Sequence, residues 1–253
     1  MAIAWNEQAA GCIVDYDFFE FLTEGRAAAD CELKILEGLF AWYEAQEACP
    51  YMTLGGEALV ADLTLIDTGW KEETWNIQPV QHFCGQVGFN SFLPSKGMSP
   101  YTRPQDSQRL LIGDHWHVSF QQSLPTVLMN SDHWKLKVHE GFLSQPGQPG
   151  ALTLFNPPRI DGRRNLTAHL SYSKHILAET WESRFVPGFK GMRTGWWKSP
   201  KPNHYFDATY QAIVARSMRR ISVLAPVAVP LPPIEASIPE TVYEPAEARR
   251  NRW

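Results

Sequence analysis

Asp67 stands at the end of an apolar run, "LTLID", and is followed by Thr68 and Gly69. This order is typical of a buried strand after which the chain turns sharply, and the ligands of open α/β sheets bind beyond the carboxyl ends of such strands. A carboxylate at that edge could hold a cation. Capping of a helix that begins near Lys71, by Asp67 or Thr68, explains the same residues equally well.

Asp207 lies in the segment "NHYFDATYQAIVARSM", which predicts a helix over residues 203–221. Residues three, seven and eleven positions after it share its face of the helix: Tyr210, Val214 and Met218. The carboxylate therefore faces the apolar side, where it needs a metal ion, another cation or strong hydrogen-bond donors. Pairing with His204 or with a lysine is the structural alternative.

Two isolated carboxylates that face one crevice suit Mg²⁺ or Mn²⁺, because these hard cations prefer oxygen ligands. Two such ions can activate a water molecule and stabilise the leaving oxygen when a phosphodiester is cleaved. Asp67 and Asp207 together thus indicate metal-assisted hydrolysis. The sequence contains no GxxxxGK[ST] loop for ATP phosphates and no GxSxG pattern of a serine hydrolase.

Histidines and cysteines give weaker signals. His115 and His117 would share one face of a strand, but no third ligand is spaced to complete a zinc site, so an exposed pair is predicted. The four cysteines form no CxxC pair, which argues against a zinc ribbon and a disulfide scaffold. We therefore expect free thiols in a reducing compartment.

The elements that must position these residues alternate between strands and helices, which predicts an α/β sheet. Strands are predicted at residues 2–6, 11–21, 58–66, 89–97, 114–120, 125–130 and 195–199. Helices are predicted at residues 27–47, 71–84, 131–142, 166–185 and 203–221. Pro79 must kink or split the second of these. The strand at 58–66 is apolar on both faces, which is typical of a strand buried on both sides.

Charge and composition limit the partners. The formal net charge of −4 gives no global attraction to nucleic acid, so DNA contact would require a local basic patch. Residues 159–201 are locally basic, although a solvated face is the usual explanation of such a run. The first residues lack the pattern of a signal peptide, so a soluble, intracellular protein is expected. The proline-rich residues 225–253 predict a disordered or extended tail.

Five motifs occur in a fixed order: "LIDTGWKEETW" with a later "FC", "LPSKG", "VLMNSDHWKLKVHEGFL", a turn with Trp and Lys, and "NHYFDATYQAI". From residue 2 to about residue 220, this order resembles the nuclease half of the large terminase subunit of tailed phages, of the lambda A-protein type. The resemblance implies an RNase H-like mixed sheet flanked by helices in residues 1–224, followed by the tail. It also implies a nuclease that cuts concatemeric viral DNA with divalent metal during genome packaging.

By this resemblance Asp67 matches the second acidic ligand, and Asp207 the third, of a two-metal site for Mg²⁺ or Mn²⁺. Lys198 and Lys201 are the expected DNA contacts. The family places its first catalytic aspartate on a strand before the hairpin at residues 2–21, and that strand and the preceding ATPase half are expected to be absent here.

Without that strand, the strands at residues 2–6 and 58–66 would each lack a hydrogen-bonded neighbour in the sheet. We therefore expect an isolated chain that is unstable or aggregation-prone, and inactive. Asp15 and Asp17 are the only nearby carboxylates that could replace the first aspartate.

The resemblance further implies double-stranded viral DNA, the small terminase subunit and the portal ring as partners in the host cytoplasm, with no membrane contact. The tail would dock on the portal, with Trp253 as its anchor. The alternative is a catalytically inert terminase fragment that contributes only DNA or portal contacts.

Overall fold

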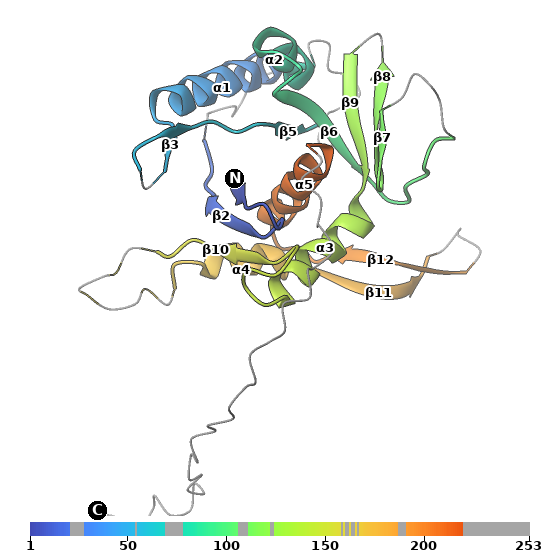
Figure 1. The fold of residues 1–253 in the computed structure, drawn as a ribbon. Coiled ribbons are helices and arrows are strands. Elements are labelled where there is room, and N and C mark those ends of the chain that lie inside the picture. Colours follow the sequence, from blue (N-terminus) through green and yellow to red (C-terminus); the bar gives the residue numbers. More distant parts are fainter. Residues whose placement is uncertain are drawn as a thin grey trace, which may run out of the picture.

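The structure is a computed structural model that describes residues 1–20, 28–53, 55–68, 78–105, 111–121, 124–157, 159, 162, 165, 167–186 and 191–219. In these residues the chain forms five helices and a mixed five-stranded sheet, accompanied by smaller sheets (Figure 1). The predicted α/β class is confirmed. The predicted tail, residues 225–253, lies outside the described residues.

The main sheet has the strand order β5-β6-β9-β8-β7. Its strands are β5 (Thr64–Asp67), β6 (Phe92–Met98), β9 (Leu124–Asn130), β8 (Trp116–Gln121) and β7 (Ile112–Gly113). β5, β6 and β9 are parallel, whereas β8 and β7 continue the sheet in antiparallel pairs. The carboxyl ends of the three parallel strands therefore lie at one edge, where Asp67 is level with Ser95.

Two helices cover one face of this sheet, α1 (Ala28–Ala48) and α2 (Pro79–Val87) (Figure 1). α2 begins with Pro79. A proline is favourable in the first turn of a helix, because the N–H that it lacks would have no helical partner there. The buried side chains of Val80, Phe83 and Cys84 pack against apolar residues of α1 and form a small core.

Helix α5 (His204–Met218) lies on the opposite face and contacts both β5 and a second sheet. That sheet has the order β1-β2-β10, formed by β1 (Ala2–Trp5), β2 (Gly11–Asp15) and β10 (Leu152–Leu154). α3 (Ser131–Leu143) packs beside α5. The large core joins these elements through buried residues such as Ile13, Val127, Val138, Phe206 and Val214.

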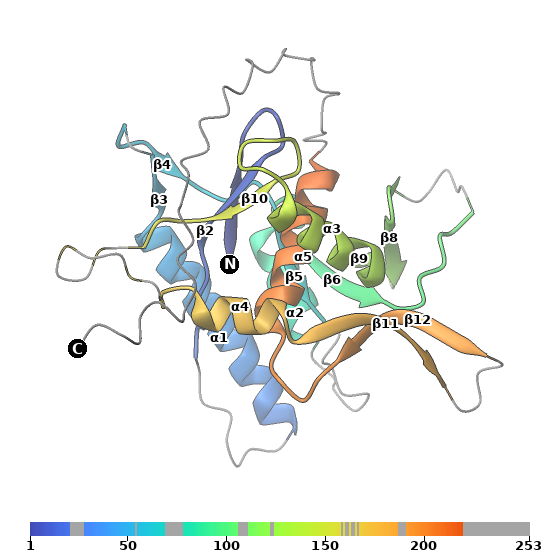
Figure 2. The ribbon, with the colours of Figure 1, turned by 90° about the horizontal axis from the view of Figure 1, so that it is seen from below.

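Helix α4 (Leu170–Ile176) leads into a long antiparallel hairpin of β11 (Glu179–Phe185) and β12 (Met192–Lys198). This hairpin extends away from the body of the protein in both views (Figures 1 and 2). A short hairpin of β3 (Tyr51–Met52) and β4 (Ala58–Leu59) follows α1.

Several predicted elements differ in extent or type, and the strand predicted at 11–21 ends at Asp15. The helix predicted at 166–185 ends at Ile176, and its second half is strand β11, because "ETWESRF" pairs along its whole length with β12. The strand predicted at 58–66 is interrupted: residues 58–59 pair with β3, and only residues 64–67 join the main sheet. Pro79, which was expected to kink or split the helix predicted at 71–84, begins α2, and residues 69–77 lie outside the described part.

Strands β1 and β5 each pair with one neighbour among the described residues, β1 with β2 and β5 with β6. All four residues of β5 are half-buried. Leu65 packs against the large core and Ile66 against the core of α1 and α2, so the expected cover on both faces is confirmed for residues 64–67. Residues 58–62 of the predicted strand are exposed, so the expectation is wrong for them. No helix in the described part of the chain is both long and apolar enough to cross a membrane.

Candidate functional site

A pocket of about 370 Å³ lies where the ends of β5 and β6 meet the first turns of α3 and α5. Its lining residues share polar or small side chains, with one tyrosine: Asp67, Gly97, Ser131, Lys135, Lys198, Asn203, His204, Asp207 and Tyr210. The two carboxylates predicted as a pair, Asp67 and Asp207, thus come from distant parts of the sequence to one pocket.

Asp207 is held by two donors. Its Oδ1 lies 2.9 Å from Nζ of Lys135, and its Oδ2 accepts a hydrogen bond of 2.8 Å from Nδ2 of Asn203. The side chain is still 32% exposed. Each oxygen of Asp207 therefore has one donor, while part of the side chain stays exposed and lines the pocket.

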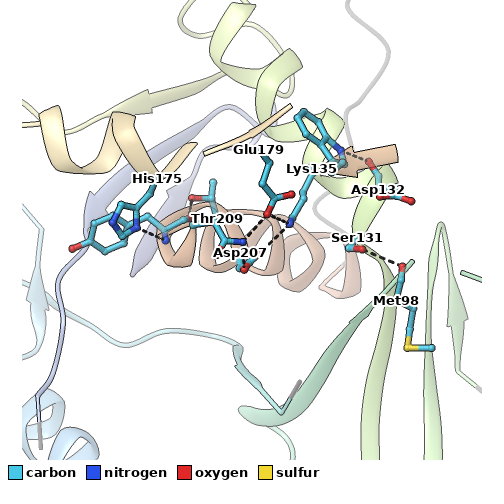
Figure 3. A network of polar contacts seen from close by, with 11 residues as sticks. Met98, Ser131, Asp132, Lys135, His175, Glu179, Asp207 and Thr209 are labelled. Carbon is cyan, nitrogen blue, oxygen red and sulfur yellow. Dashed lines mark hydrogen bonds and ion pairs between the residues drawn. The ribbon is translucent and has the colours of Figure 1, made fainter. Parts of the chain in front are cut away.

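Lys135 projects from α3 between two carboxylates (Figure 3). Its Nζ lies 2.7 Å from Oε1 of Glu179, and the side chains of Lys135 and Glu179 are 9% and 4% exposed. Nδ2 of Asn203 donates to the same Glu179 oxygen at 2.6 Å. These two acids and one ammonium carry a formal net charge of −1, and buried charges are stable only when they are paired and hydrogen-bonded in this way.

The main sheet supports the pocket through a second set of contacts. Ser131, at the start of α3, donates from its hydroxyl to the carbonyl oxygen of Met98 at 3.1 Å (Figure 3). Ser95 of β6 donates to Oε1 of Gln211 at 2.9 Å, and both residues are buried. These bonds fix α3 and α5 relative to the ends of the parallel strands.

Tyr210 lies in the floor of the pocket. Burial, and then the nearby carboxylates of Asp207 and Asp67, raise the pKa of its hydroxyl far above the ordinary value, so the group stays a neutral donor. The absence of a side chain at Gly97 leaves room for the Tyr210 hydroxyl. A Cβ on Gly97 would lie 2.4 Å from the hydroxyl oxygen.

The pocket includes Lys198 but not Lys201. Lys201 is exposed on the segment between β12 and α5, and Arg193 of β12 donates to the Ser99 hydroxyl at 2.7 Å. Arg163, Arg164 and Lys190 of the predicted basic region lie outside the described residues.

The structural alternative for Asp207 is realised by a lysine that sequence reasoning did not single out. His204 lines the pocket, but Lys135 is the residue that pairs with Asp207. Glu179 was also missed, because the segment around it was taken for a helix. A lysine among apolar residues of a predicted helix, as in "HWKLK", is the one signal that could have indicated Lys135.

The donor set of the pocket fits a hard divalent cation, since it offers carboxylate oxygens of Asp67 and Asp207 beside the Ser131 hydroxyl and the Asn203 amide. Among the described residues, neither Asp67 nor Asp207 belongs to a trio of metal-ligating side chains in mutual reach. Asp15, one proposed substitute for the first catalytic aspartate of the terminase family, instead accepts a 2.8 Å hydrogen bond from the Tyr51 hydroxyl. Neither Asp15 nor Asp17 lines the pocket.

The predicted exposed pair of His115 and His117 is wrong. His117 is buried in β8 and forms a 2.9 Å hydrogen bond with the Tyr101 hydroxyl, whereas His115 lies in the turn before β8 with φ = 54°. The two side chains therefore do not follow the alternation of one strand. His115 and Asp114 lie instead beside His133 of α3, in the one such trio among the described residues.

Comparisons of this chain with protein-family models, with curated proteins and with solved structures find no match.

Proposed function

We propose that this chain is a divalent-metal-dependent DNA endonuclease domain with an RNase H-like fold, of the kind found in large terminase subunits. The observation that supports this proposal best is the position of Asp67 and Asp207 in one pocket at the carboxyl edge of parallel strands. Ligands of α/β sheets bind at that edge, and two carboxylates are suitable ligands of Mg²⁺ or Mn²⁺. The proposed substrate, double-stranded viral DNA, follows from the resemblance in motif order.

In this proposal Asp67 and Asp207 hold the cation, which when bound supplies charge stabilisation and an activated water. Lys135 is a positioning residue, because it fixes one oxygen of Asp207 and compensates the buried charge of Glu179. Lys198 brings a positive charge to the pocket, where it can contact a phosphate of the substrate. Lys201 extends this positive charge beyond the pocket.

The proposed partners follow from the same resemblance: the small terminase subunit, and the portal ring as the docking place of residues 225–253. The ATPase half would belong to the same large subunit. A two-metal centre needs a further acidic ligand beyond Asp67 and Asp207, and none of the other described carboxylates lines the pocket.

A titration with Mn²⁺, followed by electron paramagnetic resonance of the free ion, tests the pocket directly. We expect binding to the native chain, weakened by at least about 10-fold in Asp67→Asn and in Asp207→Asn, since each variant replaces a charged ligand by a neutral one. Asp30→Asn, which changes an exposed acid at the start of α1, is the matched control and should bind like the native chain.

Nicking of supercoiled plasmid with Mn²⁺ then tests the reaction, both in this chain and in any longer reading frame that contains it. Cleavage that persists unchanged in both Asn variants would refute the assignment of the two acids. Cleavage by this chain alone would refute the expectation that it lacks an essential ligand.

One observation favours the alternative of an inert domain that only contributes contacts. Lys135 already gives Asp207 a cation at 2.9 Å, and Asn203 occupies its second oxygen. An inert domain would bind no Mn²⁺ in the pocket and would nick no plasmid in either form of the protein. The same two experiments therefore separate the two functions.

A further inference from the structure

A second group of metal-ligating side chains lies away from the pocket of Asp67 and Asp207. Asp114 and His115 form the turn between β7 and β8, and His133 lies in the first turn of α3. One ligand atom of each residue lies within 4.8 Å of the corresponding atoms of the other two. The antiparallel pairing of β8 with β9 brings them together, because it places Trp116 opposite Met129, just before α3 begins.

The turn is held in place from α3 and β9. Asn130 is central: its N–H donates to the carbonyl oxygen of His115 at 2.9 Å, and its Oδ1 accepts from the N–H of His133 at 3.2 Å. Its Nδ2 lies 3.2 Å from Nδ1 of His115. Trp134 donates from its indole to the same His115 carbonyl at 3.2 Å. The left-handed backbone of His115, which costs free energy in a residue with a side chain, is thereby maintained.

The ligand atoms of the three side chains come close without satisfying one another. The imidazole rings of His115 and His133 are stacked, with centroids 3.7 Å apart and planes 9° from parallel. Nε2 of His133 is buried and has no hydrogen-bond partner among the described residues. Nε2 of His115 lies 3.7 Å from Oδ1 of Asp114, which is too long for a hydrogen bond. Nε2 of His133 is therefore available as a ligand.

We propose that Asp114, His115 and His133 bind a first-row divalent transition metal such as Zn²⁺. Two imidazoles and one carboxylate suit Zn²⁺, Co²⁺ or Ni²⁺, whereas the oxygen donors around Asp67 and Asp207 suit Mg²⁺ or Mn²⁺. The two sites therefore differ in the chemistry of their donors, and this proposal does not depend on the proposed nuclease function.

Binding requires a small movement of one ring. Parallel imidazoles cannot direct both nitrogens at one ion, so one ring must turn before both reach the Zn–N distance of about 2.0–2.1 Å. The side chain of His115 is 41% exposed and lies in a turn, so it is the one that can turn. Three protein ligands leave a fourth position open, and His133 and Asp114 line a pocket of about 320 Å³ that can supply water or a small anion there.

The binding experiment uses the untagged native chain, titrated with Zn²⁺ by calorimetry and with Co²⁺ by visible absorption. We expect one site with a Co²⁺ spectrum of nitrogen and oxygen ligands and without a thiolate charge-transfer band. That band would indicate binding by cysteines, of which Cys49 is exposed, and would overturn the assignment.

Two variants test the ligands while sparing the fold. His115→Asn keeps a residue that tolerates a left-handed backbone, and His133→Gln keeps a polar side chain in the first turn of α3. Each should weaken Zn²⁺ binding by at least about 10-fold and reduce the rise in melting temperature on addition of Zn²⁺. The matched control is His82→Asn, which removes an exposed imidazole of α2 and should leave binding unchanged.

A native chain that binds no Zn²⁺, or variants with native affinity and a native melting temperature, would overturn the proposal. Asp67→Asn and Asp207→Asn should retain Zn²⁺ binding, since these residues belong to the other pocket. Loss of Zn²⁺ binding in those two variants alone would assign the ion to that pocket and refute the site at His133.

Discussion

Lys135 and Asp207 form an ion pair of 2.9 Å on the wall of the proposed catalytic pocket. The lysine comes from α3 and the aspartate from α5, so the pair joins two helices that pack side by side. Glu179 at the start of β11 shares the same ammonium group. One cation therefore connects three elements at the point where substrate is proposed to bind.

Replacement of Lys135 by Met should destabilise the fold by about 3–5 kcal/mol, because it leaves the buried Glu179 without a counter-charge. Urea unfolding followed by tryptophan fluorescence measures this change. The matched control is Lys137→Met, two residues further along α3, where an exposed ion pair with Glu140 should be worth less than about 1 kcal/mol. Equal losses in the two variants would contradict the role given to Lys135.

Replacement of Gly97 by Ala should cost about 1–3 kcal/mol, because the added methyl would overlap the Tyr210 hydroxyl. The second variant, Tyr210→Phe, removes that oxygen and leaves the ring, whose nearest atom lies 3.5 Å from the added Cβ. The double variant should therefore be more stable than the sum of the two single changes predicts. A double-mutant cycle in urea measures this coupling, and strictly additive losses would show that the contact is not the cause.

Stability should fall as the pH is lowered through the ordinary histidine value of about 6.5. Burial lowers the pKa of His117, His139 and His175, with His204 contributing to the shift at His175. Above the pKa of the unfolded chain these histidines are neutral in both states and do not change the free energy of unfolding. As the pH falls below the unfolded pKa, these histidines bind protons in the unfolded chain but not in the folded chain, so the free energy of unfolding decreases.

Urea midpoints at several pH values, measured in the presence of a chelator, give this slope. His139→Leu should reduce it, because His139 packs between Trp196 and Phe206 and its Nε2 has no partner in the described part of the chain. His82→Leu, at an exposed position, is the matched control. A slope that is the same in His139→Leu and in the native chain would argue against this origin.

In the part of the chain that the structure describes, β1 and β5 each pair with a single strand, and such sheet edges, which are templates for pairing, should make the chain self-associate at micromolar concentration. Ala4→Lys places a charge on the exposed face of β1 and should reduce the association. Ala45→Lys adds the same charge to an exposed position of α1 and should not. Light scattering against concentration measures the effect, and a native chain that stays monomeric throughout would refute it.

Local patterns were sufficient where one element determines its own structure. The periodicity of residues 27–47 and 203–221 predicts α1 and α5 with small errors at their ends, and the strand predicted at 125–130 is β9. The helix face that joins Asp207 to Tyr210 and Val214 is confirmed by the burial of the last two residues. These features depend on the side chains of one segment, so they can be predicted from the local sequence.

Contacts between distant segments could not be predicted in this way. β11 was mistaken for helix because its strand structure depends on pairing with β12, and β5 ends the sheet because no described strand lies on its other side. Lys135, Glu179 and Asn203 meet only after α3, β11 and α5 have packed. His133 became a third candidate ligand for the same reason, since no spacing in the sequence relates it to His115.

Helix α5 supplies both the wall of the proposed catalytic pocket and the middle of the main core. Asp207 and Tyr210 face the pocket, while Phe206 and Val214 lie in the core on the same short helix. A ligand that binds Asp207 is therefore coupled to the whole molecule rather than to a loop that could open on its own. Occupancy of the pocket should slow hydrogen exchange along the entire helix, so the backbone amides of α5 can report on ligand binding at a distance from the ligand.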